Sequence, residues 1–164
     1  MRTPLNVGIL GYGFASATFH APIIAAVPGL RLHAVASTRP SQVLADWPDV
    51  QVCDSPEVLL ARDDIDCVVI ATPNNTHHPL AARALEAGKH VVVDKPCTVT
   101  LEQTQDLLQV AQAQGRMLTV FQNRRWDADF LALRQVLDSG VLGRVVHFES
   151  HFDRYRPVVP VRWR

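Results

Sequence analysis

The sequence has 164 residues, enough for one ordinary globular domain that buries about 70% of its extended surface. Hydrophobic residues make up 48% of it and charged residues 20%, which excludes a disordered tail or a fibrous repeat. Sixteen Lys and Arg balance sixteen Asp and Glu, so no net charge attracts nucleic acid or an anionic membrane. The three Cys indicate neither a disulfide framework nor a zinc site, because no CxxC spacing occurs. With neither a signal-peptide pattern nor a long apolar run, we predict a cytoplasmic location.

Apolar strand-like runs alternate with helical patterns along the chain, which is the signature of βαβ units around a parallel sheet. Most of these runs are unbroken rather than alternating, which predicts strands that are buried on both faces. The expected strands cover residues 6–10, 32–36, 50–53, 67–71, 90–93 and 117–122.

The segments between these strands carry helix boundary signals, namely capping side chains, first-turn prolines and terminal glycines. The first predicted helix begins at Ser55–Glu57, and the second runs from Pro79 to Gly88. The third runs from a capping box at 100–103 to Gly115, and the fourth covers about residues 126–139.

The hydrophobic pattern changes after Gly143. From Val145 to Arg154, Val146, Phe148 and Phe152 alternate with polar residues, which is typical of a strand with one covered face. We therefore predict an α/β fold with a doubly wound parallel sheet, the Rossmann fold, over residues 1–143. Residues 144–164 would be the start of a truncated second α+β domain, with its first strand at 145–154, and the unpaired edge of this strand would favour self-association.

Four charged or imidazole side chains alternate along the same segment, at His147, Glu149, His151 and Asp153. They resemble metal ligands, but a straight strand lets only two neighbours share one ion, and no second element supplies partners. We predict a polar surface or a subunit interface here and no metal site.

A Gly-x-Gly turn follows the first expected strand and precedes a helix. Gly11 permits the tight turn, Gly13 lets the backbone approach a pyrophosphate, and the N–H groups of the next helix favour an anion. The usual third Gly or Ala is displaced to Ser16, with Ala15 beside it. The alternative is a βα connection without a ligand. The turn residues expected to contact a dinucleotide are Gly11, Tyr12, Gly13, Phe14 and Ala15.

The end of the second strand indicates which dinucleotide binds. An acidic side chain there normally accepts hydrogen bonds from the ribose 2′-OH of NAD. This sequence instead has Ser37, Thr38 and Arg39, which suit a 2′-phosphate, because Arg binds phosphate in a bidentate manner. The pattern favours NADP, with NAD as the alternative. In a simpler interpretation Arg39 and Pro40 only open the next helix.

Two loops follow the fourth and fifth strands, at residues 71–78 and 93–96. They carry the motifs Thr-Pro-Asn-x-x-His and Asp-Lys-Pro. The sequence resembles the glucose-fructose oxidoreductase/inositol dehydrogenase (Gfo/Idh/MocA) family in these two motifs, in the glycine turn, in the Asn-Arg-Arg-Trp segment at 123–126 and in Gly140-x-x-Gly143. The resemblance covers essentially the whole chain, although Asp94 replaces the more usual Glu.

The resemblance implies roles for individual residues. The loop after the fourth strand would line the adenine-ribose and pyrophosphate side of the cleft, largely through its backbone. Lys95 would lie beside the nicotinamide ribose and the substrate hydroxyl, and a cis peptide often precedes the residue at Pro96. Arg124 or Arg125 would face the nicotinamide carboxamide or a phosphate. The cofactor-binding residues implied in this way are Ala71, Thr72, Pro73, Asn75, His77, Asp94, Lys95, Pro96, Asn123 and Arg124.

Lys95 is the expected catalytic residue. An ammonium at a strand end can hydrogen-bond the alkoxide-like oxygen that develops as hydride leaves the adjacent carbon. It can also join a proton relay. The alternative is a solvated loop lysine.

These features and the family resemblance together predict an NAD(P)-dependent oxidoreductase, with NADP favoured over NAD, and the resemblance implies a sugar, polyol or related small hydroxyl compound as substrate. This chain would supply the cofactor-binding half of a protein that forms homo-oligomers through a further domain. The alternative is a nucleotide-binding module without catalysis.

Overall fold

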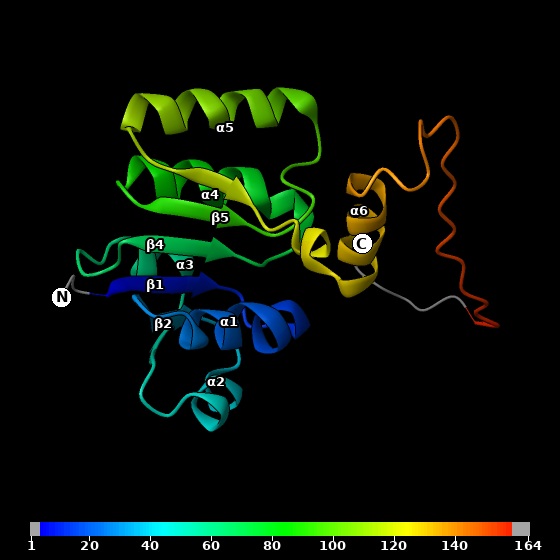
Figure 1. The fold of residues 1–164 in the computed structure, drawn as a ribbon. Helices are drawn as coiled ribbons and strands as arrows, with labels where there is room; N and C mark the ends of the chain where they lie inside the picture. Colours follow the sequence, from blue (N-terminus) through cyan, green and yellow to red (C-terminus); the bar gives the residue numbers. More distant parts are fainter. Residues whose placement is uncertain (1–3, 159–164) are drawn as a thin grey trace. The chain divides into compact units, whose positions relative to one another are not determined.

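The computed structural model describes residues 4–158. Its centre is a six-stranded sheet in the order β3-β2-β1-β4-β5-β6, with every neighbouring pair parallel (Figure 1). The chain order reverses between β1 and β4, which is the switch point of a doubly wound Rossmann sheet. The strands are β1 (Leu5–Leu10), β2 (Leu30–Ala36), β3 (Gln51–Cys53), β4 (Cys67–Ile70), β5 (His90–Val93) and β6 (Leu118–Val120).

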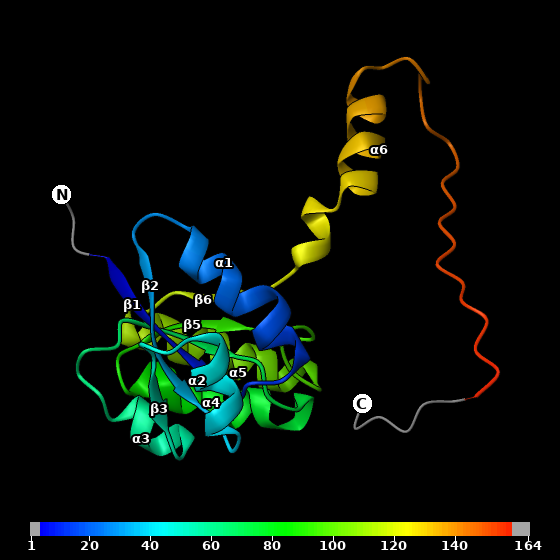
Figure 2. The same ribbon diagram turned by 90° about the horizontal axis from the view of Figure 1, so that it is seen from below.

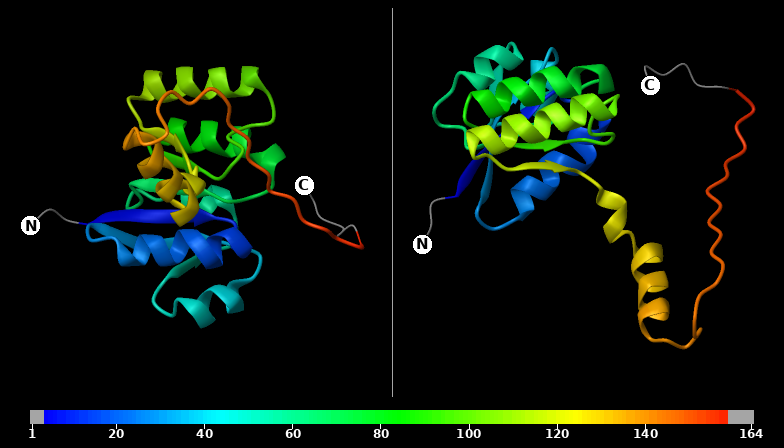
Figure 3. Two further views of the ribbon diagram at one scale, coloured as in Figure 1. Left: turned by 45° about the vertical axis from the view of Figure 1, so that its right-hand side comes forward. Right: turned by 90° about the horizontal axis from the view of Figure 1, so that it is seen from above.

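Helices connect consecutive strands and cover both faces of this sheet. Figure 1 shows α1 and α2 on one face, with α4 and α5 on the other. Figure 2 shows the first pair from below, and the right panel of Figure 3 shows α4 and α5 side by side over the sheet. The helices are α1 (Ala21–Ala26), α2 (Pro40–Asp46), α3 (Pro56–Leu60), α4 (His77–Glu86), α5 (Leu101–Gln114) and α6 (Ala128–Asp138), with a π-helical turn at Ser16–His20 and 3₁₀ turns at Asn74–Thr76 and Asn123–Trp126.

Two hydrophobic cores lie on the two faces of the sheet. One joins Leu10 and Ile70 to Leu59 of α3, Leu85 of α4 and Leu107 of α5. The other joins Ile9 and Val35 to Ile24 of α1 and Val43 of α2. All four residues of β4 are buried. The unbroken apolar runs in the sequence therefore reflect burial on both faces, and the predicted doubly wound sheet is confirmed.

The helix boundaries follow the capping signals with two differences. Ser55 Oγ accepts a hydrogen bond from the N–H of Val58 at 3.3 Å, and Gly115 ends α5 in the left-handed region at φ +60°. At the start of α5 Gln103 accepts from the N–H of Val99 rather than that of Thr100, so the capping box is displaced by one residue. The helix expected from Pro79 begins two residues earlier, at His77.

The chain divides into two compact units, Met1–Phe121 and Gln122–Arg164. The second contains α6 and an extended segment, and the predicted strand over residues 145–154 is not formed. A strand is stabilised by hydrogen bonds to a neighbouring strand, and no segment within residues 4–158 pairs with this one. Residues 159–164 lie outside the described range. The expected domain boundary at residue 143 stays a prediction.

Candidate functional site

Four loops follow the carboxyl ends of β1, β2, β4 and β5, the edge at which open parallel sheets bind ligands. Backbone hydrogen bonds fix these loops to the sheet. The N–H of Gly11 donates to the carbonyl of Ala36 at 2.9 Å, and the N–H of Ala71 donates to the carbonyl of Leu10 at 3.0 Å. The N–H of Asp94 donates to the carbonyl of Ile70 at 2.8 Å. Each loop is thus tied to the strand beside its own.

Gly11 is required by the fold itself. Its φ is +87°, a conformation that residues with a side chain rarely adopt. A Cβ atom on Gly11 would lie 3.0 Å from Thr72 Cγ2 and 3.2 Å from the carbonyl oxygen of Ala71. The turn after β1 therefore packs directly against the loop after β4.

Gly13 has no such explanation within the protein. Its φ is not positive, and the atom nearest to a Cβ placed on it is Arg39 Nη2 at 4.0 Å. The glycine leaves an open space above a backbone that leads into a helix, where first-turn N–H groups lack partners within the helix. A phosphate group that approaches closely uses both the space and these donors, so the turn fits a dinucleotide.

Arg39 lies across this turn. Its Nη2 donates a hydrogen bond to the carbonyl oxygen of Tyr12 at 2.7 Å, and its N–H donates to Ser37 Oγ at 3.0 Å. Ser37, Thr38 and Arg39, which were predicted to bind the cofactor, thus adjoin the glycine turn. Thr38 and Arg39 are exposed, and no carboxylate occurs between Ala36 and Arg39.

The other turn residues offer mainly their backbone to a ligand. The side chain of Tyr12 is buried, and its hydroxyl donates to Asp46 at 2.8 Å and accepts from Trp47 Nε1 at 2.9 Å. Burial and the bond to Asp46 raise the pKa of Tyr12 to about 12. Phe14 is exposed and Ala15 half-buried. No pattern in the sequence indicates that Tyr12 anchors the turn to α2.

The loop after β4 is held by its own threonines. The hydroxyls of Thr72 and Thr76 are 2.6 Å apart, and Thr76 Oγ1 donates to the carbonyl of Pro73 at 2.6 Å. Asn75 is exposed, whereas Ala71 and Thr72 are half-buried. The side chain of His77 is fully buried and its ring nitrogens face carbonyl oxygens, so it points into the protein.

The loop after β5 presents Lys95 at the surface. The peptide bond between Lys95 and Pro96 is cis, as expected, and the N–H of Lys95 donates to Asp94 Oδ1 at 2.8 Å. Burial alone would raise the pKa of Asp94, but the nearby His20 ring, the hydrogen bond from this N–H and the charge of Lys95 outweigh it and lower the pKa. Asp94 is therefore a carboxylate at neutral pH.

His20 is a polar residue of this site that sequence reasoning missed. Its ring is buried and lies against Phe121, with the centroids 4.3 Å apart and the ring planes tilted by 47°. Its Nε2 is 3.9 Å from Asp94 Oδ2. That nitrogen has no hydrogen-bond partner within the described residues. The sequence signal that could have identified His20 is a His side chain within a mainly apolar helical segment.

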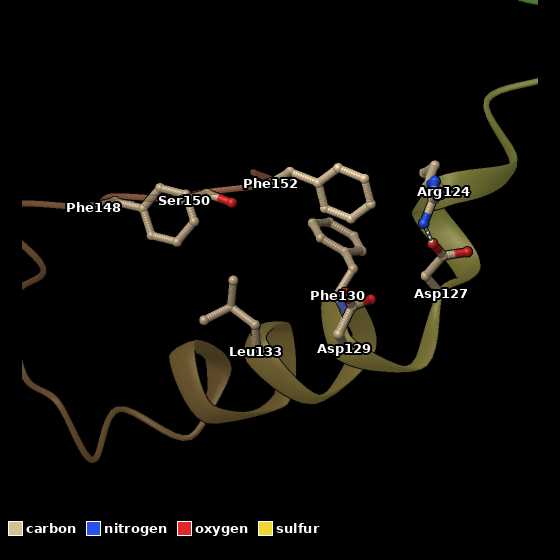
Figure 4. Close-up of a pocket in the computed structure, with 8 residues that line it drawn as sticks. All are labelled: Arg124, Asp127, Asp129, Phe130, Leu133, Phe148, Ser150 and Phe152. Atoms are coloured by element: carbon tan, nitrogen blue, oxygen red, sulfur yellow. Dashed lines mark hydrogen bonds and ion pairs between the residues drawn. The ribbon is translucent and has the colours of Figure 1, made fainter. Parts of the chain in front are cut away.

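Asn123 and Arg124 belong to the second unit, and their predicted contact with the cofactor stays a prediction. Arg124 forms an ion pair with Asp127, and its guanidinium lies 5.2 Å from the ring centroid of Phe152. These side chains border a cavity of about 460 Å³ between α6 and the extended segment (Figure 4). Its walls include Phe130, Leu133 and Phe148, so it is mainly apolar.

Residues 4–158 contain neither a group of three or more His, Cys, Asp or Glu side chains that could hold a metal ion nor a helix with the length and hydropathy of a membrane span.

The switch-point location, the open glycine turn and the basic residue beside it define a nicotinamide-dinucleotide-binding Rossmann domain. Residues 5–122 match the family described as "Oxidoreductase family, NAD-binding Rossmann fold". The chain belongs to this Gfo/Idh/MocA oxidoreductase family.

Similar proteins support this assignment. The chain is 57% identical to the uncharacterized oxidoreductase YdgJ of Escherichia coli over 100% of this chain and 47% of YdgJ. It is 35% identical to the Bacillus subtilis scyllo-inositol 2-dehydrogenase (NADP(+)) IolW, over 98% of this chain and 45% of IolW. The solved structure of YPO2259 from Yersinia pestis matches with a TM-score of 0.95 at 57% identity, over 100% of this chain and 47% of that protein. The chain thus spans about half the length of these relatives.

Proposed function

We propose that this chain supplies the cofactor-binding half of an NADP-dependent dehydrogenase that acts on a polyol, a sugar or a related hydroxyl compound. The observation that carries the proposal is the open space at Gly13 with the Arg39 guanidinium at its edge. A 2′-phosphate needs a cation at this place, whereas the ribose of NAD needs a carboxylate. The similarity to an inositol dehydrogenase named for NADP+ supports both the cofactor and the substrate class.

Nucleotide binding tests the choice of cofactor. The Arg39→Ala variant should bind NADPH about 10- to 100-fold more weakly, because a hydrogen bond to a charged group contributes about 1.5–3 kcal/mol. NADH affinity should change much less. Arg31→Ala is the matched control, since Arg31 is exposed near the start of β2, far along the strand from the turn. Equal losses for NADPH and NADH in calorimetric titrations would contradict the assignment.

The remaining predicted contacts belong to the same proposal. The backbone of Gly11 to Ala15 would bind the pyrophosphate, and the loop from Ala71 to His77 would line the adenosine side. Asp94, Lys95 and Pro96 would lie at the nicotinamide side, together with Asn123 and Arg124.

The bound nicotinamide would supply the hydride acceptor, and Lys95 would act on the oxygen of the alcohol. The exposed ammonium would donate a hydrogen bond to that oxygen and stabilise the negative charge that develops on it. Asp94 would orient the lysine through the main chain, because its Oδ1 accepts from the N–H of Lys95. His20 is placed to hold the other carboxylate oxygen.

Turnover separates an enzyme from a nucleotide-binding module. With NADP+ and a panel of polyols, Lys95→Ala should lose most turnover, about 100-fold or more, while it keeps NADPH affinity. The exposed Arg116, at the opposite end of the unit before β6, provides a control as Arg116→Ala. NADPH binding without turnover by the unaltered chain would support the non-catalytic module for the chain by itself. Turnover retained in Lys95→Ala would remove Lys95 from the mechanism.

Two further expectations remain proposals. The cytoplasmic location rests on the sequence pattern alone. Assembly into homo-oligomers through a further domain is consistent with relatives about twice as long as this chain.

A further inference from the structure

The ring of His77 lies between the two loops that carry the proposed nicotinamide and adenosine sides of the site. Its Nδ1 is 2.8 Å from the carbonyl oxygen of Pro96, and its Nε2 is 2.9 Å from that of Thr72. The side chain is fully buried, so water does not replace either partner. A carbonyl oxygen only accepts hydrogen bonds, so the ring nitrogen that carries the proton donates to the carbonyl that it faces. The two contacts place the ring between the two loops.

We propose that His77 is a positioning residue: its buried ring contacts the carbonyl oxygens of Pro96 and Thr72 through its two nitrogens, and so fixes the Lys95–Pro96 segment to the loop after β4. The inference deepens the proposed function, on which its binding test rests. The hydrogen-bond geometry itself is independent of that function.

The two loops depend on His77 to different degrees. The loop after β4 has other supports, namely the Thr72–Thr76 contact, the bond from Thr76 to Pro73, and the packing of Thr72 against Gly11. On the other side, the bond to His77 is the side-chain contact that holds the carbonyl of Pro96, one residue after Lys95. Loss of the imidazole should therefore free the lysine loop more than the loop after β4.

The neighbouring His78 does not share the arrangement of His77. Its Nε2 lies 2.7 Å from Asp106 of α5, a contact at the surface.

NMR measurement of solvent exchange at the ring N–H of the unaltered chain tests the bridging directly. Because the ring of His77 is fully buried and its nitrogens face carbonyl oxygens, its N–H should exchange with water more slowly than that of the partly exposed His78. Exchange at His77 as fast as at His78 would overturn the proposal. The result does not depend on nucleotide binding.

Binding of two nucleotides tests the positioning role. His77→Phe keeps a ring and removes both ring nitrogens, and it should weaken NADPH binding about tenfold, the effect of one lost interaction of about 1.4 kcal/mol. Its affinity for 2′,5′-ADP, which lacks the nicotinamide half, should stay within about twofold. His78→Phe is the matched control and should change neither affinity.

The outcomes of this second test are distinct. Unchanged NADPH binding by His77→Phe, or an equal loss for both nucleotides, would overturn the positioning role. If His77→Phe does not fold, His77→Gln retains one donor and is tested in the same way. If the unaltered chain binds neither nucleotide, the proposed function fails, while the NMR result still decides whether His77 bridges the loops.

Discussion

Three glycines near β1 are glycine for three different reasons. Gly8 lies in the strand under α3, where a Cβ would come within 2.7 Å of Leu59 Cδ2. Gly11 needs its positive φ, and Gly13 meets no protein atom nearer than 4.0 Å. The first two serve the fold, so only Gly13 is free to serve a ligand. The sequence motif treats Gly11 and Gly13 alike, and the structure separates their roles.

Gly13→Ala should therefore separate binding from stability. The added methyl group meets no clash, so the thermal unfolding midpoint should stay within about 2 °C, while NADPH binding weakens about tenfold or more because the methyl group occupies the space of the phosphate. Gly11→Ala is the comparison and should lower the midpoint, since alanine is strained at φ +87°. Unimpaired NADPH binding by Gly13→Ala would contradict the role of this turn.

The buried hydroxyl of Tyr12 gives a prediction for alkaline pH. Its pKa is about 12 in the folded chain and about 10 in an unfolded one, so the folded state favours the protonated form. The resulting stabilisation is complete below pH 10 and is lost as the pH rises toward 12, by up to roughly 2 kcal/mol. Urea unfolding between pH 9 and 12 should show a steeper loss for the unaltered chain than for Tyr12→Phe. Stability curves that fall in parallel for the two proteins would contradict this prediction. The Cys67 thiol, with its pKa raised to about 11, titrates in both proteins and so does not account for a difference between them.

At the scale of elements, local signals predicted most of the fold. The six strands were found because both faces of the sheet are buried, which leaves unbroken apolar runs. Ser55 and Gly115 marked helix ends because capping is a local interaction. The start of α4 was missed by two residues, since Pro79 also fits inside the first turn. The strand expected at 145–154 is not formed in the structure. A strand needs hydrogen bonds to a second strand that is distant in the sequence, and a local pattern does not report whether that strand is present.

The places of the candidate site residues in the fold were predictable from local signals, while their binding roles stay predictions. Motif positions such as Gly11, Arg39 and Lys95 follow strand ends, and parallel strands bring these ends to one edge. The contact of His77 with Pro96 and the approach of His20 to Asp94 join segments 19 or more residues apart. No local pattern encodes such pairs, so only the structure reveals them.

The seating of α3 on β1 gives a prediction for this element. Gly8→Ala should destabilise the chain by about 1–3 kcal/mol, because Leu59 is fully buried and has little room to move. In the double variant with Leu59→Ala the clash disappears, so its loss should be smaller than the two single losses added together. Strict additivity in urea unfolding would indicate that Leu59 does not limit the space at Gly8.

At the scale of the whole molecule, burial is unevenly distributed between the two units. Both hydrophobic cores consist of residues between Val7 and Leu118, and α6 has no buried residue. Within residues 122–158 large apolar side chains are exposed, including Val146, Phe148 and Phe152. The stability of the described chain therefore resides in the first unit, while the second presents apolar surface to water.

Shortening the chain to residues 1–121 tests this division. The shortened chain should unfold cooperatively within about 2–4 °C of the full chain, because the cores are intact and a shift of that size corresponds to at most about 1 kcal/mol. The full chain should self-associate as its concentration rises, whereas residues 1–121 should stay monomeric, since exposed apolar groups promote association. Thermal unfolding and light scattering measure the two effects. A full chain that stays monomeric at high concentration would contradict the expected association through the second unit. A shortened chain that does not fold would contradict the expectation that the first unit carries the stability.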